Sequence, residues 1–280
     1  MTMLVSTSWL AAHLADDDLL ILDASYFLPD AGRDARAEHA AGHIPGAVFM
    51  DLARLKDDSN PLPAMMPDCD QFRAHAQALG LRNTGRIVLY DDAPHHTSAR
   101  AWVMLRHFGF DDVSVLDGGL ARWREEGRPL ETGFTTPREG HINMLLERPD
   151  IRTLADVRAN IDSGREQIVD ARGPARFSGE EQETRPGLAS GHIPGSCNLP
   201  YDRLFNADGT WKQGNALREA FTAAQVDLDR PMVTSCGSGI TASALIFGAA
   251  LLGKHDTALY DGSWTEWGAD PATPKAVGPA

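Results

Sequence analysis

The sequence of 280 residues has few cysteines, lacks long apolar runs and carries more acidic than basic side chains. Its three cysteines, Cys69, Cys197 and Cys236, are sparse and odd in number, which argues against a disulfide framework. No two of them have the C-x-x-C spacing of a zinc or dithiol redox site. We therefore expect reduced thiols in a reducing compartment, with neither a bound metal nor another cofactor.

The missing apolar runs and the charge balance exclude further classes of protein. No stretch approaches the roughly 18 consecutive apolar residues of a transmembrane helix, so we expect no membrane-spanning segment. The formal net charge of −13 makes nucleic acids and anionic membrane surfaces poor partners. Residues 1–10 lack the positive region and the apolar core of a secretion signal, and we expect a cytoplasmic location.

The chain contains two copies of one pattern. In the first half, a predicted strand at 21–24 precedes Gly-His-Ile-Pro-Gly at 42–46. In the second half, a predicted strand at 168–171 precedes the same five residues at 191–195. Each half alternates short β-branched runs with helical segments, which is typical of α/β domains. The sequence therefore predicts two tandem domains, each a mainly parallel β-sheet flanked by helices.

Domain boundaries follow from the segments that lack this pattern. The stretch after the first copy has no clear periodicity, and the chain end is rich in Ala, Pro and Gly. We expect a first domain at 1–138, a linker at 139–152, a second domain at 153–272 and a loose tail at 273–280.

Cys236 stands between a strand predicted at 232–235 and an apolar helix that opens at Thr241. The Gly-Ser-Gly turn after the cysteine permits positive φ and allows several N–H groups to converge on one point. Converging N–H groups and a helix N-terminus stabilise an anion and lower the pKa of a thiol. The alternative is an inert, buried cysteine in an ordinary turn. The residues of this loop alone favour neither interpretation.

A gap-free pairing of the two halves that starts at Asp117 and Asp261 predicts Asp92 as the counterpart of Cys236. A carboxylate is a poor nucleophile for soft centres, and Pro94 removes a backbone donor from the first loop. We therefore expect the first loop not to bind an anion as the second does, the first domain to be structural and the second to carry the chemistry.

These residues resemble the tandem-domain rhodanese superfamily and, within it, the 3-mercaptopyruvate sulfurtransferases. His-Ile-Pro-Gly alone is a weak match, but it occurs twice, the second time at the family's distance before a cysteine loop. The other segments that carry the resemblance are Leu-Asp-Ala-Ser-Tyr at 22–26, Gly-Arg-Asp-Ala-Arg at 32–36, Val-Asp-Ala-Arg at 169–172, Arg-Phe at 176–177, Cys-Gly-Ser-Gly-Ile-Thr at 236–241 and Tyr-Asp-Gly-Ser-Trp at 260–264. The resemblance covers nearly the whole chain.

The resemblance implies sulfur transfer by double displacement. The Cys236 thiolate takes a sulfur from a small donor, 3-mercaptopyruvate or thiosulfate, and becomes a persulfide. With 3-mercaptopyruvate the other product is pyruvate, which leaves as an enolate. A thiol such as that of thioredoxin, or cyanide, then accepts the sulfur.

The resemblance also implies roles for individual residues, with Cys236 and Ser238 as the catalytic pair. The substrate-binding residues that it implies are Arg176, Arg185, Gly237, Gly239, Ile240 and Thr241. The two arginines would hold the substrate carboxylate as planar, bidentate cations, although without the resemblance they are ordinary surface arginines. We expect Arg172 to be a structural partner of Asp170 and His192 to line the core.

Three functions stay open, and the loop composition favours a 3-mercaptopyruvate sulfurtransferase. Gly237 and Ser238 are small and neutral, which fits 3-mercaptopyruvate better than the thiosulfate dianion. Ala242 stands where a related branch of phosphatases has the arginine of its Cys-x5-Arg loop, so phosphatase activity is not expected. Ala53 and Ala64 replace an acid and a histidine proposed to relay a proton in better-known relatives. The alternatives are a thiosulfate sulfurtransferase and a persulfide carrier or docking module with little turnover.

The loop composition generates a first testable prediction. Ser238→Arg adds a cation beside Cys236, and we expect it to shift the ratio of the two activities from 3-mercaptopyruvate toward thiosulfate. Parallel assays with both donors measure the ratio, and Ser238→Ala controls for loss of the hydroxyl. An unchanged ratio in Ser238→Arg would contradict this interpretation of the loop.

Overall fold

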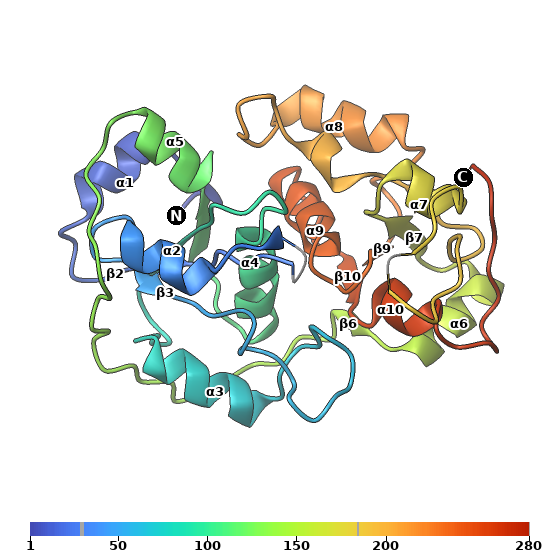
Figure 1. Ribbon diagram of the computed structural model, residues 1–280, viewed down its shortest axis with the longest axis horizontal. Helices are drawn as coiled ribbons and strands as arrows, with labels where there is room; N and C mark the ends of the chain where they lie inside the picture. Colours follow the sequence, from blue (N-terminus) through green and yellow to red (C-terminus); the bar gives the residue numbers. More distant parts are fainter. Residues whose placement is uncertain (29–30, 184, 280) are drawn as a thin grey trace. The chain divides into compact units, whose positions relative to one another are not determined.

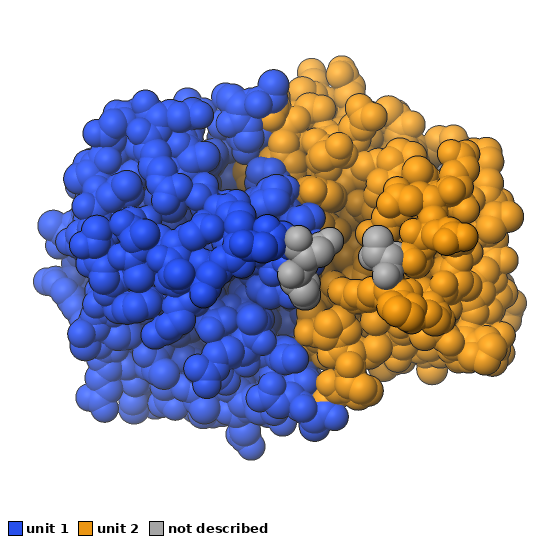
Figure 2. Space-filling view, viewed as in Figure 1, with its two compact units in different colours: residues 1–59, 66–148, 207–210 blue, residues 60–65, 149–206, 211–280 orange. Residues whose placement is uncertain are grey.

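The computed structural model describes residues 1–28, 31–183 and 185–279. Within these residues the chain forms two compact units, which Figure 2 colours separately. Unit 1 comprises the described parts of 1–59, 66–148 and 207–210, and unit 2 those of 60–65, 149–206 and 211–280. No helix of the described part is long and apolar enough to cross a membrane.

Unit 1 is built on a parallel sheet in the order β1-β5-β4-β2-β3, with helices around it (Figure 1). Its strands are β1 (Leu4–Val5), β2 (Leu19–Asp23), β3 (Val48–Phe49), β4 (Arg86–Tyr90) and β5 (Val113–Leu116). Its helices are α1 (Thr7–His13), α2 (Ala35–Ala41), α3 (Cys69–Ala78), α4 (Ser98–His107) and α5 (Gly119–Glu125).

Unit 2 repeats this topology with a parallel sheet in the order β6-β10-β9-β7-β8. Its strands are β6 (Ile151–Arg152), β7 (Gln167–Asp170), β8 (Cys197–Asn198), β9 (Met232–Ser235) and β10 (Thr257–Tyr260). Its helices are α6 (Leu154–Ser163), α7 (Pro174–Ser178), α8 (Gly214–Ala223), α9 (Ala242–Leu251), α10 (Ser263–Trp267) and the 3-10 helix η2 (Tyr201–Leu204). The prediction of two α/β domains with mainly parallel sheets is confirmed.

The central elements of unit 2 are buried on every side. All four residues of β9 are buried, because a central parallel strand is covered on both faces. Helix α9 is buried from its first residue to Ala250 and packs against β9 and β10, as Figure 1 shows. This explains why the α9 segment appears in the sequence as a nearly continuous apolar run, without an amphipathic period.

The carboxyl ends of the parallel strands place the loop of Cys236 beside the segment after β7. In the register of the sheet, Asp170 at the end of β7 pairs with Ser235 at the end of β9. Cys236 therefore follows directly at the edge where Arg172 leaves the neighbouring strand. Ligands of open α/β sheets bind at this edge, because the loops from several strands meet there.

The strand register shows that the predicted counterpart of Cys236 was wrong. Tyr90 and Ser235 each pair with the acid that ends the neighbouring strand, so they are equivalent. The next residue in unit 1 is Asp91, and Asp91 rather than Asp92 therefore corresponds to Cys236. The first loop holds one extra residue before its helix, which a gap-free pairing from the downstream side cannot detect.

The chain end is ordered against unit 2, which contradicts the expectation of a loose tail. Ala276 forms an antiparallel bridge with His192, through two backbone hydrogen bonds of 2.8 and 2.9 Å. The Trp267 indole donates to the Pro274 carbonyl at 2.8 Å, and Thr273 is buried. Composition could not indicate this bridge, because it pairs single residues distant in sequence. Ala280 lies outside the described residues.

The predicted linker at 139–152 contains the short strand β6, which pairs with β10 in the sheet of unit 2. Two residues of strand carry too little pattern to be detected in the sequence. The other predicted domain boundaries remain predictions.

The turn at the start of α5 generates a prediction on stability. Gly119 has a φ of +57°, and a Cβ there would clash with the Asp91 carbonyl oxygen. Gly127 has a similar φ of +65° with no atom within 4 Å of such a Cβ. We expect Gly119→Ala to lower the free energy of unfolding by about 3 kcal/mol or more. Gly127→Ala should cost about 1 kcal/mol. Denaturant titration measures both, and equal losses would contradict the clash.

Candidate active site

The carbonyl groups of the Cys236 loop are bound by the start of α10. Cys236 is 2% exposed, and its carbonyl oxygen accepts the Trp264 N–H at 2.9 Å. The Gly237 carbonyl oxygen accepts both the N–H and the hydroxyl of Thr265, at 2.9 and 2.6 Å. The two carbonyl oxygens, which are the negative ends of the peptide dipoles, therefore point toward α10.

Two of the loop N–H groups are also bound within unit 2. The N–H groups of Cys236 and Gly239 both donate to the Ser263 hydroxyl oxygen, each at 3.1 Å. The remaining loop N–H groups have no acceptor in the described part of the chain; they belong to Gly237, Ser238, Ile240 and Thr241. The loop thus presents four unsatisfied donors, which suit an anion.

The equivalent loop of unit 1 holds an anion of its own. The Asp91 carboxylate accepts the Ala93 N–H at 3.1 Å and the Ser98 N–H at 2.8 Å, the latter from the first residue of α4. The loop and helix N-terminus therefore bind a carboxylate where unit 2 has a thiol. This was not expected, since the first loop was predicted to be unsuited to anions.

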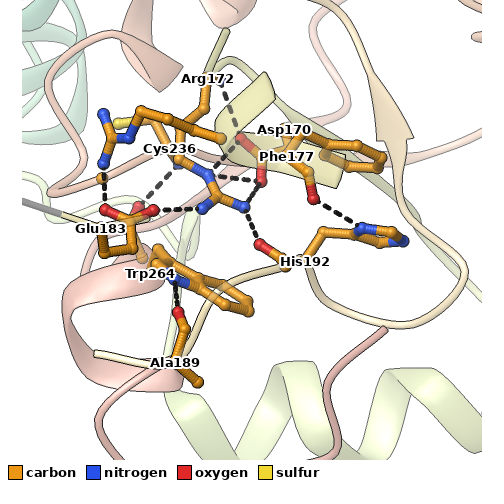
Figure 3. Close-up of polar contacts among 12 residues, drawn as sticks. Asp170, Arg172, Phe177, Glu183, Ala189, His192, Cys236 and Trp264 are labelled. Carbon is orange, nitrogen blue, oxygen red and sulfur yellow. Dashed lines mark hydrogen bonds and ion pairs between the residues drawn. The ribbon is translucent and has the colours of Figure 1, made fainter. Parts of the chain in front are cut away.

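A buried network of charges lies beside the Cys236 loop (Figure 3). The Arg172 side chain is 1% exposed and donates to both Asp170 carboxylate oxygens, at distances of 2.6 to 3.1 Å. It also donates to Glu183 at 2.8 Å, and its guanidinium lies 4.4 Å from the centre of the Trp264 ring. Burial opposes the charge, but the two carboxylates raise the pKa of Arg172. The predicted structural role of Arg172 is confirmed.

Arg176 is held next to the loop by the same carboxylate. Its NH2 group donates to Glu183 at 2.5 Å, and the Glu183 side chain is 1% exposed. A Cβ built on Gly237 would lie 3.6 Å from this NH2 group. The Nε of Arg176 is buried and has no partner in the described part of the chain. Glu183 therefore joins the structural arginine to the predicted substrate-binding one.

Arg185 reaches the loop through a hydroxyl. It donates to the Thr265 hydroxyl oxygen at 2.5 Å, and that hydroxyl donates to the Gly237 carbonyl. The charge of Arg176 is balanced by a carboxylate, whereas Arg185 is bound to a neutral group. The structure thus brings both predicted arginines to the Cys236 loop, with different charge compensation.

His192 braces the turn of the second Gly-His-Ile-Pro-Gly segment, as predicted. It is 4% exposed, and its ring stacks on Phe177 with centroids 3.8 Å apart. Its Nδ1 donates to the Phe177 carbonyl at 2.9 Å, a contact drawn in Figure 3. The imidazole therefore supports α7, which carries Arg176.

The sequence reasoning missed three residues of this site: Glu183, Ser263 and Thr265. The only sequence signal for Glu183 is an acid between two arginines of interest. Ser263 lies in the Tyr-Asp-Gly-Ser-Trp segment that carries the resemblance, but no role was predicted for it, and Thr265 follows that segment. Ala53 lies in unit 1 and Ala64 in the segment 60–65 assigned to unit 2, and neither side chain can transfer a proton.

The bridging carboxylate generates a prediction. Glu183→Gln leaves a buried guanidinium with one carboxylate fewer, and we expect it to lower the free energy of unfolding by about 3 kcal/mol. Glu38→Gln is the matched control, since Glu38 binds Arg33 at the same 2.5 Å but both side chains are more than a third exposed. That control should cost under about 1 kcal/mol. Comparable losses in denaturant titrations would contradict the bridge.

Comparison with known proteins identifies the family of the chain. A rhodanese-like domain matches residues 6–126 and again residues 153–270. The 3-mercaptopyruvate sulfurtransferase of Homo sapiens is 41% identical over 270 residues, 94% of this chain and 91% of that protein. The thiosulfate sulfurtransferase of Bos taurus is 39% identical over 271 residues, 94% and 91% of the two chains. The crystal structure of the 3-mercaptopyruvate sulfotransferase SseA from Escherichia coli has a TM-score of 0.85 and 37% identity, covering 94% of this chain and 99% of that one. The chain therefore belongs to the rhodanese-like family, as a tandem of two such domains.

Proposed function

We propose that the protein is a 3-mercaptopyruvate sulfurtransferase with Cys236 as its nucleophile. One observation carries the proposal: Cys236 is the only one of the three cysteines in a loop with unsatisfied N–H groups and two adjacent arginines, within the described residues. Relatives named for this activity are about 40% identical over most of the chain, which supports the assignment.

The reaction begins when the Cys236 thiolate attacks the sulfur of the donor. The carbon–sulfur bond breaks, its electron pair forms the enolate of pyruvate, and Cys236 keeps the sulfur as a persulfide. The N–H groups of Gly237, Ser238, Ile240 and Thr241 stabilise the terminal sulfur anion. An acceptor, either cyanide or a thiol such as that of thioredoxin, then attacks this outer sulfur and restores the thiolate.

The two arginines bind the substrate carboxylate. Arg185 supplies the net charge, because its partner is the neutral Thr265 hydroxyl. Arg176 orients the carboxylate, because the buried Glu183 fixes one edge of the Arg176 guanidinium. Glu183 also offsets part of the positive charge of Arg176. Such local charge is needed, since the whole chain carries a formal charge of −13.

The enolate must be protonated, and Ser238 is the candidate within the loop. The residue is 9% exposed, and its hydroxyl has no hydrogen-bond partner among the described residues that would compete with substrate. With alanine at positions 53 and 64, the proton comes through Ser238 or from water.

Thiosulfate is the second candidate donor. The bovine thiosulfate sulfurtransferase and an Arabidopsis relative named for both donors are 39% and 38% identical to this chain. The neutral Gly237 and Ser238 favour the keto acid over the dianion. The Arabidopsis relative is named as mitochondrial, and the cytoplasmic location of this chain remains a prediction.

The other two thiols differ from Cys236 in their surroundings. Burial and a hydrogen bond to Glu147 raise the pKa of the Cys69 thiol. Burial raises the pKa of the Cys197 thiol. A raised pKa keeps both thiols protonated at neutral pH, and the protonated form is the weaker nucleophile.

Intact mass after incubation with 3-mercaptopyruvate tests the proposal. We expect the wild-type protein to gain one sulfur atom, and Cys236→Ser to gain none and lose turnover. Cys69→Ser and Cys197→Ser are the matched controls and should retain both the added sulfur and turnover. A persulfide that persists in Cys236→Ser would exclude Cys236 as the nucleophile. A persulfide formed only from thiosulfate would favour the second candidate donor.

A further inference from the structure

Ser263, the first residue of α10, has an unusual backbone conformation. Its φ is +51°, in the left-handed region that L-residues other than glycine, asparagine and aspartate rarely adopt. The residue is fully buried, at 0% exposure. An unfavourable backbone conformation persists when the surroundings demand it, and such residues cluster at functional sites.

The Ser263 hydroxyl makes every hydrogen bond that a hydroxyl can make. It donates to the Tyr260 carbonyl at 2.8 Å and accepts the N–H groups of Cys236 and Gly239, each at 3.1 Å. One oxygen atom therefore joins the residue before the Gly-Ser-Gly turn to the residue at its end. The Ser263 hydroxyl thus binds two N–H groups of the loop, while the next residues of α10 bind two of its carbonyl groups.

Unit 1 has the same backbone conformation without the hydroxyl. The counterpart of Ser263 is Gly119, with a φ of +57°, and each follows an Asp-Gly pair. There the loop is held by the segment that follows β2, because the Asp92 N–H donates to the Ser25 hydroxyl at 2.9 Å. The half with no nucleophile uses the residue that tolerates this φ, and the half with Cys236 uses one that does not.

We propose that Ser263 is a positioning residue that shapes the Cys236 loop for its sulfur anion, an inference that rests on the proposed function. By taking the N–H groups of Cys236 and Gly239, its hydroxyl sets the curvature of the loop. The N–H groups of the four intervening and following residues then converge at the sulfur. Ser263 acts through the loop backbone and does not itself touch the donor.

Two substitutions distinguish a role of Ser263 in positioning the loop from a role in the stability of unit 2. Ser263→Gly removes the hydroxyl but suits the left-handed backbone, as Gly119 does in unit 1. Ser263→Ala removes the hydroxyl and keeps the unfavourable φ. Ser243→Ala is the matched control, because Ser243 is equally buried and contacts the same loop, but its hydroxyl donates to the Gly239 carbonyl at 3.0 Å.

We expect Ser263→Gly to lose less stability than Ser263→Ala, because glycine suits the positive φ, yet to lower kcat by about 10²-fold with a smaller change in KM. The midpoint pH of Cys236 alkylation by iodoacetamide should rise, because the loop N–H groups no longer converge on the thiolate. Ser263→Ala should show the same kinetic change with lower stability. Ser243→Ala should lower stability without moving the alkylation midpoint.

Amide hydrogen exchange in the wild-type protein tests the contact without any variant. The amides of Cys236 and Gly239 should exchange more slowly than those of Gly237 and Ser238. In Ser263→Gly both protected amides should become fast. Equal exchange across the loop in the wild-type protein, or wild-type kcat and alkylation in Ser263→Gly, would overturn the proposal.

The two proposals fail in different ways. A wild-type protein that takes no sulfur from either donor contradicts the proposed function, whatever Ser263 does. A wild-type protein that forms the Cys236 persulfide, with Ser263→Gly equally fast, contradicts only the role of Ser263.

Discussion

The candidate site depends on which backbone N–H and carbonyl groups of the Cys236 loop have hydrogen-bond partners within unit 2. The carbonyl oxygens of Cys236 and Gly237 are bound by the first N–H groups of α10, and two loop N–H groups are bound by one serine hydroxyl. Four N–H groups of the loop that follows the Cys236 thiol have no acceptor in the described part of the chain. Unsatisfied donors in a buried turn are costly, and an anion bound there would offset that cost.

A buried network of ion pairs lies beside this loop. Asp170, Arg172 and Glu183 are buried, which their mutual ion pairs and hydrogen bonds make tolerable. Glu183 then extends the network to Arg176 next to the loop. A single buried carboxylate thus joins the ion-pair network of unit 2 to Arg176, whereas Arg185 is bound to the Thr265 hydroxyl.

The two units show how one fold supports different loop chemistry. Their sheets have the same strand order, and both place an anion-binding turn after the central strand. Unit 1 fills that turn with its own Asp91 carboxylate, and one extra residue lengthens the loop. Unit 2 has a thiol at the equivalent position, and four N–H groups of its turn have no acceptor in the described part of the chain. One side chain thus decides whether the loop is satisfied from within.

The tandem α/β architecture and the strand before Cys236 could be predicted from the sequence, because periodicity and repeated motifs are local properties. The arginines near the Cys236 loop were indicated only by the resemblance to the rhodanese family. The sequence did not identify Asp91 as the counterpart of Cys236, the anchored chain end, or the roles of Glu183, Ser263 and Thr265. These were decided by tertiary structure, since strand register and buried hydrogen bonds join residues far apart in the chain. A serine or an acid has many possible partners, and only the fold selects one.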